Sequence, residues 1–462
     1  MQCLHNEMQI DAEWGQLLFG TVSSLPGRKL SRRAALRCAA GVAGALLVGC
    51  GPSSTTVTPS PAAQNTAAEA ATLLLWHGWS GAERQVLSVL ADRFNRKRAS
   101  GRILLQSVPL ASFAAEFRSA VGAGSGPHLI LVPNTWLGLL ASDNGLMQFE
   151  DAELAAEQKA LLPAALAGAM IADGAGKRVL VGLPVRFDTM ALFYNSANVL
   201  TPPADTVSLL ESARGLGEPS ADPPLWGLAL NLSLDNTIGY LYAFEGRVFD
   251  DAGLLVLGDA GRAGAERWLV WLQSLNADTR IFAHTESSIT VDQTIKSGHA
   301  LMTFDWSYQL ATYRSLWGES LGIAPLPRLA ETGKAPQSYV RSDVIAINSR
   351  VNTAERQAAL EFARYLAGAE AQQELLGADI QPARLLALEG EGSTLTAARA
   401  LRAQAEIGAA MPNSVERSVV DQELRVMLQQ VLMGLATPSD AVTDADRRLR
   451  ERLVNAVPTA TP

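Results

Sequence analysis

The chain has 462 residues, of which 48% are hydrophobic and 18% charged, and its formal net charge is −8. A single hydrophobic core stops growing beyond about 250–300 residues, so this length predicts two lobes or domains. The apolar content excludes a largely disordered chain. The acidic balance, with scattered basic residues, makes nucleic acid a poor candidate partner.

The first 49 residues have the features of an export leader. Paired arginines within Ser31–Arg37 precede an apolar, Gly/Ala-rich run from Cys38 to Gly49. This run is too short to cross a hydrocarbon core of about 30 Å as a helix, but it suits a signal peptide. It ends in Leu47-Val48-Gly49-Cys50, which resembles a bacterial lipobox, and the arginines resemble a twin-arginine signal. The alternative is a buried N-terminal helix with a chance cysteine.

The segment 50–71 combines the predicted lipidated Cys50 with a Ser/Thr/Pro-rich and then Ala-rich tract, which is typical of a flexible tether. The chain has three cysteines, all within the first 50 residues, so the globular part contains no internal disulfide. Lipid, tether and globule in this order predict an exported protein anchored on the extracytoplasmic face of a membrane.

The globular part opens with a short apolar run, Leu73–Trp76, that predicts a buried strand. A helix is expected to begin at Ser80, because Ser80 and Glu83 have capping-box spacing. Trp76, His77 and Trp79 then lie at the carboxyl end of the first strand, where open α/β sheets bind ligands. Core packing is the alternative for both tryptophans.

The same alternation continues along the chain. Ile103–Leu105 and His128–Val132 are predicted strands, separated by a helix whose apolar face includes Phe113 and Phe117. Pro133-Asn134-Thr135-Trp136 opens another helix. Strands alternating with helices predict a doubly wound α/β lobe.

The stretch Gly182–Asn195 consists of two apolar runs separated by a polar step that contains Arg186 and Asp188. It predicts strand, hinge and strand, with Pro184 fixing the backbone just before the step. A carboxylate and a guanidinium at a crossing between lobes are placed to line a cleft. A hinge salt bridge between Arg186 and Asp188 is the alternative.

Several motifs, in this order and spacing, resemble the family 1 extracellular solute-binding proteins, the sugar receptors of bacterial ABC importers. They are Leu74–Trp79, Leu131–Trp136, Gly182–Pro184 with Phe193–Asn195, Gly298–Trp306, Gly322–Pro327, Ala346–Asn348 and Gly434–Pro438. The resemblance implies the two-lobed, type II periplasmic-binding-protein-like α/β fold, with a doubly wound sheet and flanking helices in each lobe and a cleft between them. It assigns residues 72–187 with 342–385 to the N-terminal lobe and 188–341 with 386–456 to the C-terminal lobe. Crossings are expected near Asp188, Arg341 and Gln381-Pro382.

The resemblance also implies a binding site. Asp188 falls where maltose-type members have a sugar-binding glutamate, and Trp306 matches the family's stacking tryptophan. The aromatic that such members place shortly after Met411-Pro412-Asn413 is absent. The full expected set of ligand-binding residues is Trp76, His77, Trp79, Asn134, Trp136, Arg186, Asp188, Asn231, Asp235, Asn236, Tyr240, Asp305, Trp306 and Arg341.

A competing motif is Gly318-Glu319-Ser320-Leu321-Gly322, which has the G-x-S-x-G pattern of serine hydrolases. That nucleophile elbow needs a strand before it and a helix after it, whereas here Tyr308–Trp317 is predicted helical and Ile323–Leu326 strand-like. We therefore expect no catalytic residue. The histidines show no metal-ligand spacing, and we expect neither a metal nor another cofactor.

These observations predict the lipid-anchored substrate-binding component of an ABC importer, which captures a carbohydrate by hinge closure. A di- or oligosaccharide is expected, with maltose-type ligands among the candidates. The expected partners are this ligand, the permease subunits and the membrane, through lipid on Cys50, and the protein is expected to be a monomer. The alternatives are a receptor of the same family for glycerol phosphate or another polyol and, more distantly, a surface lipoprotein hydrolase that uses Ser320 or paired carboxylates.

Overall fold

The computed structural model describes residues 71–97, 101–142, 144–173, 176–250, 253–284 and 288–456. All of them belong to one compact unit, residues 66–462. The predicted leader, the predicted lipidation site Cys50 and nearly all of the predicted tether lie outside the described residues. None of the helices described is long and apolar enough to cross a membrane.

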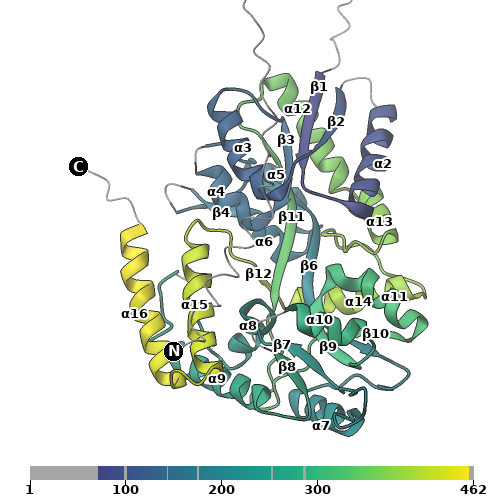
Figure 1. Ribbon diagram of the computed structural model, residues 1–462. Helices are drawn as coiled ribbons and strands as arrows, with labels where there is room; N and C mark the ends of the chain where they lie inside the picture. Colours follow the sequence, from purple (N-terminus) through teal and green to yellow (C-terminus); the bar gives the residue numbers. More distant parts are fainter. Residues whose placement is uncertain are drawn as a thin grey trace, which may run out of the picture. The chain divides into compact units, whose positions relative to one another are not determined.

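The chain begins with alternating strands and helices (Figure 1). These are β1 (Ala71–His77), α2 (Gly81–Lys97), β2 (Gly101–Ser107), α3 (Leu110–Gly122), β3 (Leu129–Pro133), the 3-10 helix η1 (Asn134–Trp136), α4 (Leu137–Ala141), α5 (Asp151–Gln158), α6 (Pro163–Gly168), β4 (Met170–Ala172) and β5 (Arg178–Leu180). The spacing of Leu87, Leu90 and Phe94 gives α2 one apolar face, and all three are buried.

The next element, β6 (Gly182–Asn195), is a single strand of 14 residues, and it is buried from Gly182 to Phe193. The predicted break at the polar step is therefore wrong. Arg186 and Asp188 stay within a buried strand because each has an oppositely charged partner there. Pro184 lacks an amide hydrogen to donate, and the pairing of β6 with β11 shifts register next to it, between Asp343 and Val344.

A second run of elements follows β6: α7 (Thr206–Leu216), β7 (Ala229–Asn231), α8 (Leu234–Ala243), α9 (Arg262–Asn276), β8 (Phe282–His284), α10 (Ser288–Lys296), β9 (Met302–Trp306), η2 (Ser307–Gln309), α11 (Leu310–Trp317), η3 (Gly318–Ser320) and β10 (Leu321–Ala324). The chain then returns along β11 (Tyr339–Ile347) and continues with α12 (Thr353–Leu366), α13 (Ala369–Gly377), α14 (Ser393–Glu406), β12 (Ala409–Ala410), α15 (Arg417–Leu432) and α16 (Pro438–Ala456).

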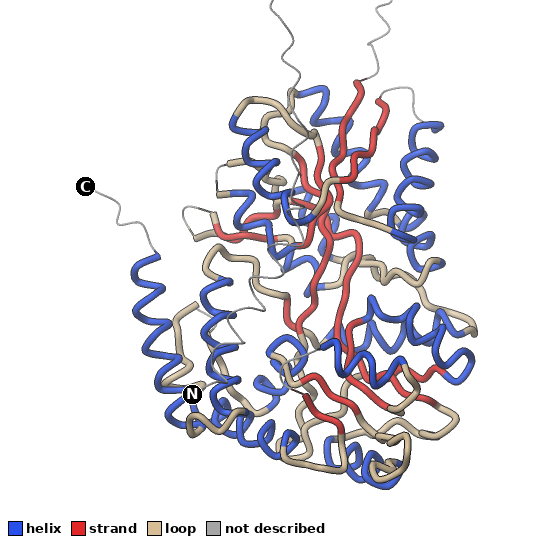
Figure 2. Tube along the Cα trace, viewed as in Figure 1, coloured by secondary structure: helices blue, strands red, loops and turns tan. Residues whose placement is uncertain are grey.

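One mixed sheet connects these elements in the order β2-β1-β3-β11-β6-β9-β7-β8, with β10 also pairing β6 and β12 pairing β11. The pairs of β1 with β2 and β3 are parallel, whereas β11 is antiparallel to both β3 and β6. The first half of β6 pairs with β11 and its second half with β9. In Figure 2 the long strands β6 and β11 accordingly run from one group of helices to the other.

Among the described residues, three large hydrophobic clusters and a smaller fourth one, Leu376 with Leu386 and Ala398, pack around this sheet. The first contains Leu75, Phe113 and Phe362, and we call the elements that build it the first lobe. The second and third clusters, which contain Trp268 and Leu401 respectively, define the second lobe. In β6 the residues Met190 and Leu192 enter the second cluster, while Ala191 and Phe193 enter the third. Strand residues alternate between faces, so the second-lobe sheet has a core on each side.

Candidate functional site

Charged side chains oppose one another where β6 and β11 pass between the lobes. Arg186 and Asp188 are two residues apart on β6, and Arg341 and Asp343 have the same spacing on β11. The register sets Arg341 opposite Asp188 and Asp343 opposite Arg186. Residues two apart share one face of a strand, so the four side chains form a cross-strand ladder of alternating charge.

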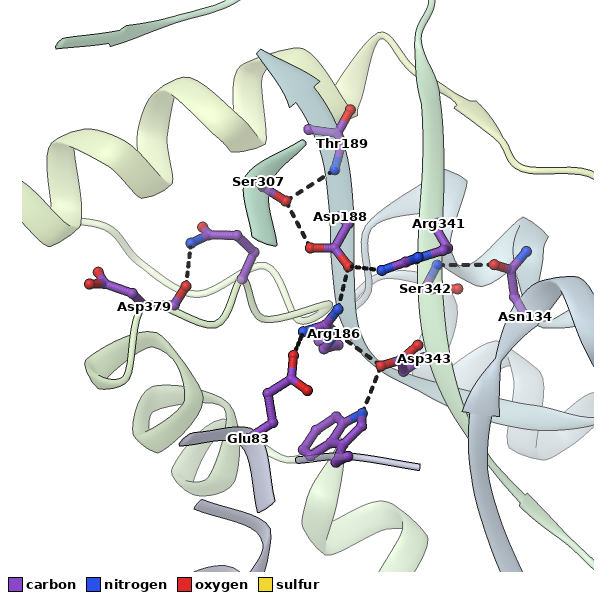
Figure 3. A network of polar contacts seen from close by, with 12 residues as sticks. Glu83, Asn134, Arg186, Asp188, Thr189, Ser307, Arg341, Ser342, Asp343 and Asp379 are labelled. Carbon is purple, nitrogen blue, oxygen red and sulfur yellow. Dashed lines mark hydrogen bonds and ion pairs between the residues drawn. The ribbon is translucent and has the colours of Figure 1, made fainter. Parts of the chain in front are cut away.

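The members of this ladder are ion-paired (Figure 3). Arg341 Nη2 lies 2.9 Å from Asp188 Oδ2, and Arg186 Nε lies 3.0 Å from Asp343 Oδ2. Arg186 also pairs with Asp188 on its own strand and with Glu83 on α2. The ladder thus extends from the crossing strands to the first helix of the first lobe.

Asp188 is only 3% exposed, and its carboxylate is fully engaged. Oδ2 meets both Arg186 and Arg341, and Oδ1 accepts a hydrogen bond from Ser307 Oγ at 3.0 Å. Burial acts to raise the pKa of Asp188, but the two guanidinium charges outweigh it and hold the pKa below its ordinary value. In this structure Asp188 forms the hinge ion pair that was the alternative, and its role as an acceptor for sugar hydroxyls stays a prediction.

The turn between β1 and α2 is fastened to the same ladder. The indole Nε1 of Trp79 donates to Asp343 Oδ2 at 2.7 Å, and the Arg186 guanidinium lies 6.0 Å from the centre of the Trp79 ring. Burial raises the pKa of Glu83. These contacts hold the turn between β1 and α2 against the crossing strands β6 and β11.

A cavity of about 490 Å³ opens beside this turn, and we call it the hinge cavity. It is lined from the first lobe by Trp79, Glu83 and Leu110, from the crossing strands by Arg186, Arg341 and Asp343, and from the second lobe by Tyr308, together with Gly78, Ser80, Ala82, Leu131 and Pro133. Both lobes and both crossing strands therefore contribute to one cavity, and its wall combines aromatic rings with charged groups.

Tyr308 is the exposed aromatic residue of this region. Its side chain is 50% exposed, whereas Trp306 is 8% exposed and donates from Nε1 to Asn236 Oδ1 at 3.3 Å. The two rings are nearly parallel, with 6.4 Å between centroids and 11° between planes. The guanidinium of Arg341 also lies over the Tyr308 ring, 5.4 Å from the ring centre. Sequence reasoning expected Trp306 to stack on a ligand, but Tyr308 presents the larger free surface.

A smaller cavity of about 220 Å³ lies on the second-lobe side of Tyr308, and we call it the lobe-2 cavity. Its lining comes from the ends of β7 and β9 and from α8, α10 and η2: Asn231, Ser233, Asp235, Asn236, Val291, Asp292, Thr303, Phe304, Asp305, Trp306, Tyr308 and Gln309. Tyr308 lines both cavities. Carboxyl ends of strands that meet at one edge of a sheet are where α/β proteins place their ligands.

Three predicted residues lie in the first-lobe core and line neither cavity. Trp76 and Trp136 both pack on Phe113, with ring centroids 6.1 Å and 5.9 Å away. His77 is 2% exposed, and burial lowers its pKa. The core-packing alternative thus describes Trp76, and a ligand contact for these three residues stays a prediction.

Asn134 and Tyr240 were also expected to contact a ligand, and the structure gives both a buried partner instead. Asn134 donates from Nδ2 to the carbonyl of Met411 at 2.9 Å, and its Oδ1 accepts from the amide of Ser342 at 3.1 Å. Tyr240 lies in the second-lobe core and donates to the carbonyl of Pro327 at 2.9 Å. Both side chains stabilise the fold.

The structure therefore brings together eight of the fourteen predicted residues around the two cavities: Trp79, Arg186, Asn231, Asp235, Asn236, Asp305, Trp306 and Arg341. Sequence reasoning missed Glu83, Asp343 and Tyr308. The i, i+2 spacing of Arg341 and Asp343 repeats that of Arg186 and Asp188 and was a usable signal. Glu83 gave no such signal, because its partner lies more than 100 residues away. No group of His, Cys, Asp or Glu in the described part of the chain is arranged to hold a metal ion.

The protein thus consists of two lobes joined by long crossing strands, with a cavity lined from both. Solved structures share this fold. A maltose/maltodextrin-binding domain MalE from Bdellovibrio bacteriovorus, bound to maltotriose, has a TM-score of 0.65 at 22% identity and covers 83% of this chain and 100% of its own. A cyclo/maltodextrin-binding protein complexed with maltotetraose has a TM-score of 0.71 at 20% identity, covering 85% and 98%. The GacH receptor of Streptomyces glaucescens has a TM-score of 0.66 at 20% identity, covering 84% and 99%.

The chain belongs to the bacterial extracellular solute-binding protein family, whose model matches residues 90–386, well over half of the sequence. The maltotriose-binding protein of Pyrococcus abyssi (strain GE5 / Orsay) is 24% identical over 297 residues, which are 63% of this chain and 62% of that protein. The match thus spans less than two thirds of that relative. The family and the two-lobed α/β fold predicted from the sequence are both confirmed, and the family's extracellular character agrees with the predicted export.

Proposed function

We propose that this protein is the substrate-binding component of an ABC importer and that it captures a di- or oligosaccharide, with maltodextrins as the leading candidates. The observation that carries the proposal is the hinge cavity, where an exposed tyrosine from one lobe and charged and aromatic groups from the other face the same space. The named ligands of the relatives, maltotriose and maltotetraose, support the same class.

The chemistry of the two cavities suits a sugar. Pyranose rings pack their C–H faces on aromatic planes, and Tyr308 offers such a plane with half of its surface free. Sugar hydroxyls need donors and acceptors around the ring, and the lobe-2 cavity supplies a carboxylate at Asp235 and an amide at Asn236. A ligand that contacts both lobes drives closure, because only differential contacts shift a conformational equilibrium.

A glycerol-phosphate receptor is the alternative within the family, and the charge at the hinge disfavours it. Phosphate binding needs uncompensated cationic groups. Here Arg186 and Arg341 are paired with the carboxylates of Glu83, Asp188 and Asp343. The hinge therefore has no excess positive charge to offer an anion.

A hydrolase role for Ser320 has no support in the local structure. In the G-x-S-x-G segment Gly318–Ser320 form the 3-10 helix η3 and Leu321-Gly322 begin β10, and α11 precedes the segment. A nucleophile elbow requires the opposite order, strand and then helix. We therefore propose a binding role without catalysis. Anchoring through lipid on Cys50, docking to permease subunits and a monomeric state complete the proposal, and they rest on the sequence and the family.

A thermal-shift panel tests the ligand class. The domain from residue 71 onward is mixed with maltose, maltotriose, maltotetraose, monosaccharides, polyols and glycerol phosphate. At a ligand concentration 100 times Kd, binding adds about 2.7 kcal/mol to the free energy of unfolding, so a matching ligand raises Tm by several degrees. No shift with any carbohydrate contradicts the proposal, and so does conversion of an oligosaccharide into products.

Two variants of Tyr308 test whether the thermal shift comes from binding in the cleft. Tyr308→Ala removes the exposed ring and is expected to weaken saccharide binding at least about tenfold, which is about 1.4 kcal/mol. Tyr308→Phe keeps the ring and is expected to bind nearly as wild type. Equal affinities for wild type and Tyr308→Ala would move the ligand away from these cavities.

A further inference from the structure

Arg341 occupies a distinct position at the hinge. It lies on β11 directly opposite Asp188 of β6, and it lines the hinge cavity together with Tyr308. Its side chain is 32% exposed, whereas those of Arg186 and Asp188 are 6% and 5% exposed. Of the two hinge guanidinium groups, Arg341 is thus the one that a molecule in the cavity can reach.

The guanidinium of Arg341 is oriented by two neighbours. Nη2 donates to Asp188 Oδ2 at 2.9 Å, and the group lies 5.4 Å from the ring centre of Tyr308. A guanidinium is planar and carries its five donors in a fixed fork, so fixing one nitrogen fixes the directions of the others. Its Nε is buried and has no hydrogen-bond partner among the described residues, so a ligand can reach only the exposed part of the side chain, which is 32% of it. Among the described residues the side chain makes one hydrogen bond, from Nη2 to Asp188, so Arg341 has donor capacity that the protein itself does not use.

Asp188 differs from Arg341, because its hydrogen-bonding capacity is already used within the protein. Both of its oxygens already accept hydrogen bonds from Arg186, Arg341 or Ser307. At this pair the group that faces the cavity is therefore the donor Arg341, because Asp188 lines neither cavity. The acceptor for this donor is a neutral oxygen, because the neighbouring carboxylates already balance the cationic charge of the hinge.

We propose that Arg341 is the specificity-determining donor of the cleft, that it recognises one hydroxyl, ring or glycosidic oxygen of a neutral saccharide seated against Tyr308, and that Asp188 acts through it as a positioning residue. This inference rests on the proposed carbohydrate function and deepens it. Arg341 donates a hydrogen bond to one particular oxygen, whereas Tyr308 only packs against the face of a sugar ring. Asp188 does not touch the ligand and determines where the donors of Arg341 point.

The test is a cycle between protein variants and ligand analogues, measured by isothermal titration calorimetry. The probes are maltotriose and maltotriose analogues that each lack one hydroxyl. The wild-type protein is expected to lose at least tenfold in affinity for one analogue. Arg341→Gln is expected to bind maltotriose at least tenfold more weakly than wild type and to bind that analogue and maltotriose alike. Arg341→Lys keeps the charge without the planar fork and is expected to lose the same discrimination.

Asp188→Asn tests the positioning role. It is expected to reduce discrimination between maltotriose and the analogue, and Asp188→Asn combined with Arg341→Gln is expected to be no weaker than Arg341→Gln alone. If Asp188→Asn does not fold, Ser307→Ala removes one of the hydrogen bonds to Asp188 and replaces it in the cycle. Arg214→Gln, which breaks an ion pair with Asp278 away from both cavities, is the control and leaves affinity and discrimination unchanged.

The outcomes separate the two proposals. Wild-type discrimination retained by Arg341→Gln would overturn the role of Arg341 while leaving a carbohydrate receptor in place. Equal losses for maltotriose and every analogue in all variants would mean that the ladder only stabilises the fold. Failure of the wild-type protein to bind maltotriose or any analogue, together with no thermal shift for any other carbohydrate, would overturn both proposals.

Discussion

Asp305 lies near the end of β9 and lines the lobe-2 cavity, and the fold raises its pKa. Its Oδ1 accepts from the amide of Trp306 at 2.7 Å, and its Oδ2 accepts from the Tyr313 hydroxyl at 2.6 Å. Burial raises its pKa from the ordinary 3.8 to about 6, against these two hydrogen bonds. The charge of Asp292 raises the pKa further, and that of Lys296 lowers it. An ionised Asp305 therefore costs free energy in the folded state.

The pH dependence follows from the sign of this shift. Between about pH 4 and pH 6 the folded protein binds a proton at Asp305 that the unfolded chain does not, so stability rises as pH falls through 6. Above pH 6 both states are ionised, and the full cost applies, about 3 kcal/mol for a shift of this size. Asp305→Asn is expected to raise the free energy of unfolding at pH 7.5 and to lose this advantage by pH 4. Urea unfolding at both values measures it. A pH-independent difference between variant and wild type would contradict the assignment.

Single residues also show how much of the candidate site could be predicted from the sequence. Arg186, Asp188 and Arg341 attracted attention in the sequence because polar residues inside apolar strands are conspicuous, and the structure sets Asp188 and Arg341 opposite each other on β6 and β11. The sequence could not reveal that Asp188 is saturated, since Ser307 and Arg341 reach it from more than 100 residues away. The difference between Trp306 and Tyr308 was equally hidden, because exposure depends on the helix that follows β9.

At the scale of elements, the segment between β12 and α15 fastens the second-lobe helices to the first lobe. Asn413 donates from Nδ2 to the carbonyls of Gly168 and Met170 at 2.8 Å and 2.9 Å. Asn134 donates to the carbonyl of Met411 at 2.9 Å in the same segment. The chain then enters α15, which packs on α9 and α16. Asn134, which was predicted to bind the ligand, and Asn413, which was not, thus both connect the lobes.

Paired substitutions separate this role from binding. Asn134→Ala leaves a buried carbonyl at Met411 and a buried amide at Ser342 without their partner, and is expected to lower the free energy of unfolding by about 1–3 kcal/mol. Asn236→Ala, at the lobe-2 cavity, removes the acceptor of one part-buried hydrogen bond from Trp306 and is expected to cost less stability than Asn134→Ala while weakening saccharide binding. Denaturant unfolding and calorimetry give the two quantities. Tenfold weaker binding by Asn134→Ala at unchanged stability would return that residue to the ligand site.

The elements themselves were largely predictable from periodicity. Short apolar runs indicated β1 and β3, and the apolar stripe of α2 agreed with its buried face. The error was β6, where a polar step between apolar runs was interpreted as a break. Local patterning could not show that Asp343 and Arg341 on β11 lie opposite the polar residues and allow the strand to continue. Long-range pairing, which a single sequence does not display, decided the outcome.

At the scale of the whole molecule, the proposed mechanism depends on two lobes that share strands. β6 and β11 are each part of both lobes, so motion of one lobe against the other bends these strands (Figure 1). The residue boundaries 187/188, 341/342 and 385/386 stay predictions. The hinge cavity lies between Trp79 of the first lobe and Tyr308 of the second, and a ligand that contacts both is expected to favour the closed arrangement.

Closure is measurable with introduced cysteines, because every native cysteine lies within the first 50 residues. Val89 on α2 and Ile289 on α10 are 45% and 59% exposed and belong to different lobes, so spin labels there report on the cleft. Saturating maltotriose is expected to shorten the mean distance between the labels in the Val89→Cys, Ile289→Cys protein. A pair within the second lobe, Leu200→Cys with Val270→Cys, is expected to keep its distance, because that lobe moves as one body. Tight binding with both distances unchanged would exclude hinge closure and leave a rigid receptor, in which affinity comes only from contacts that already exist without ligand.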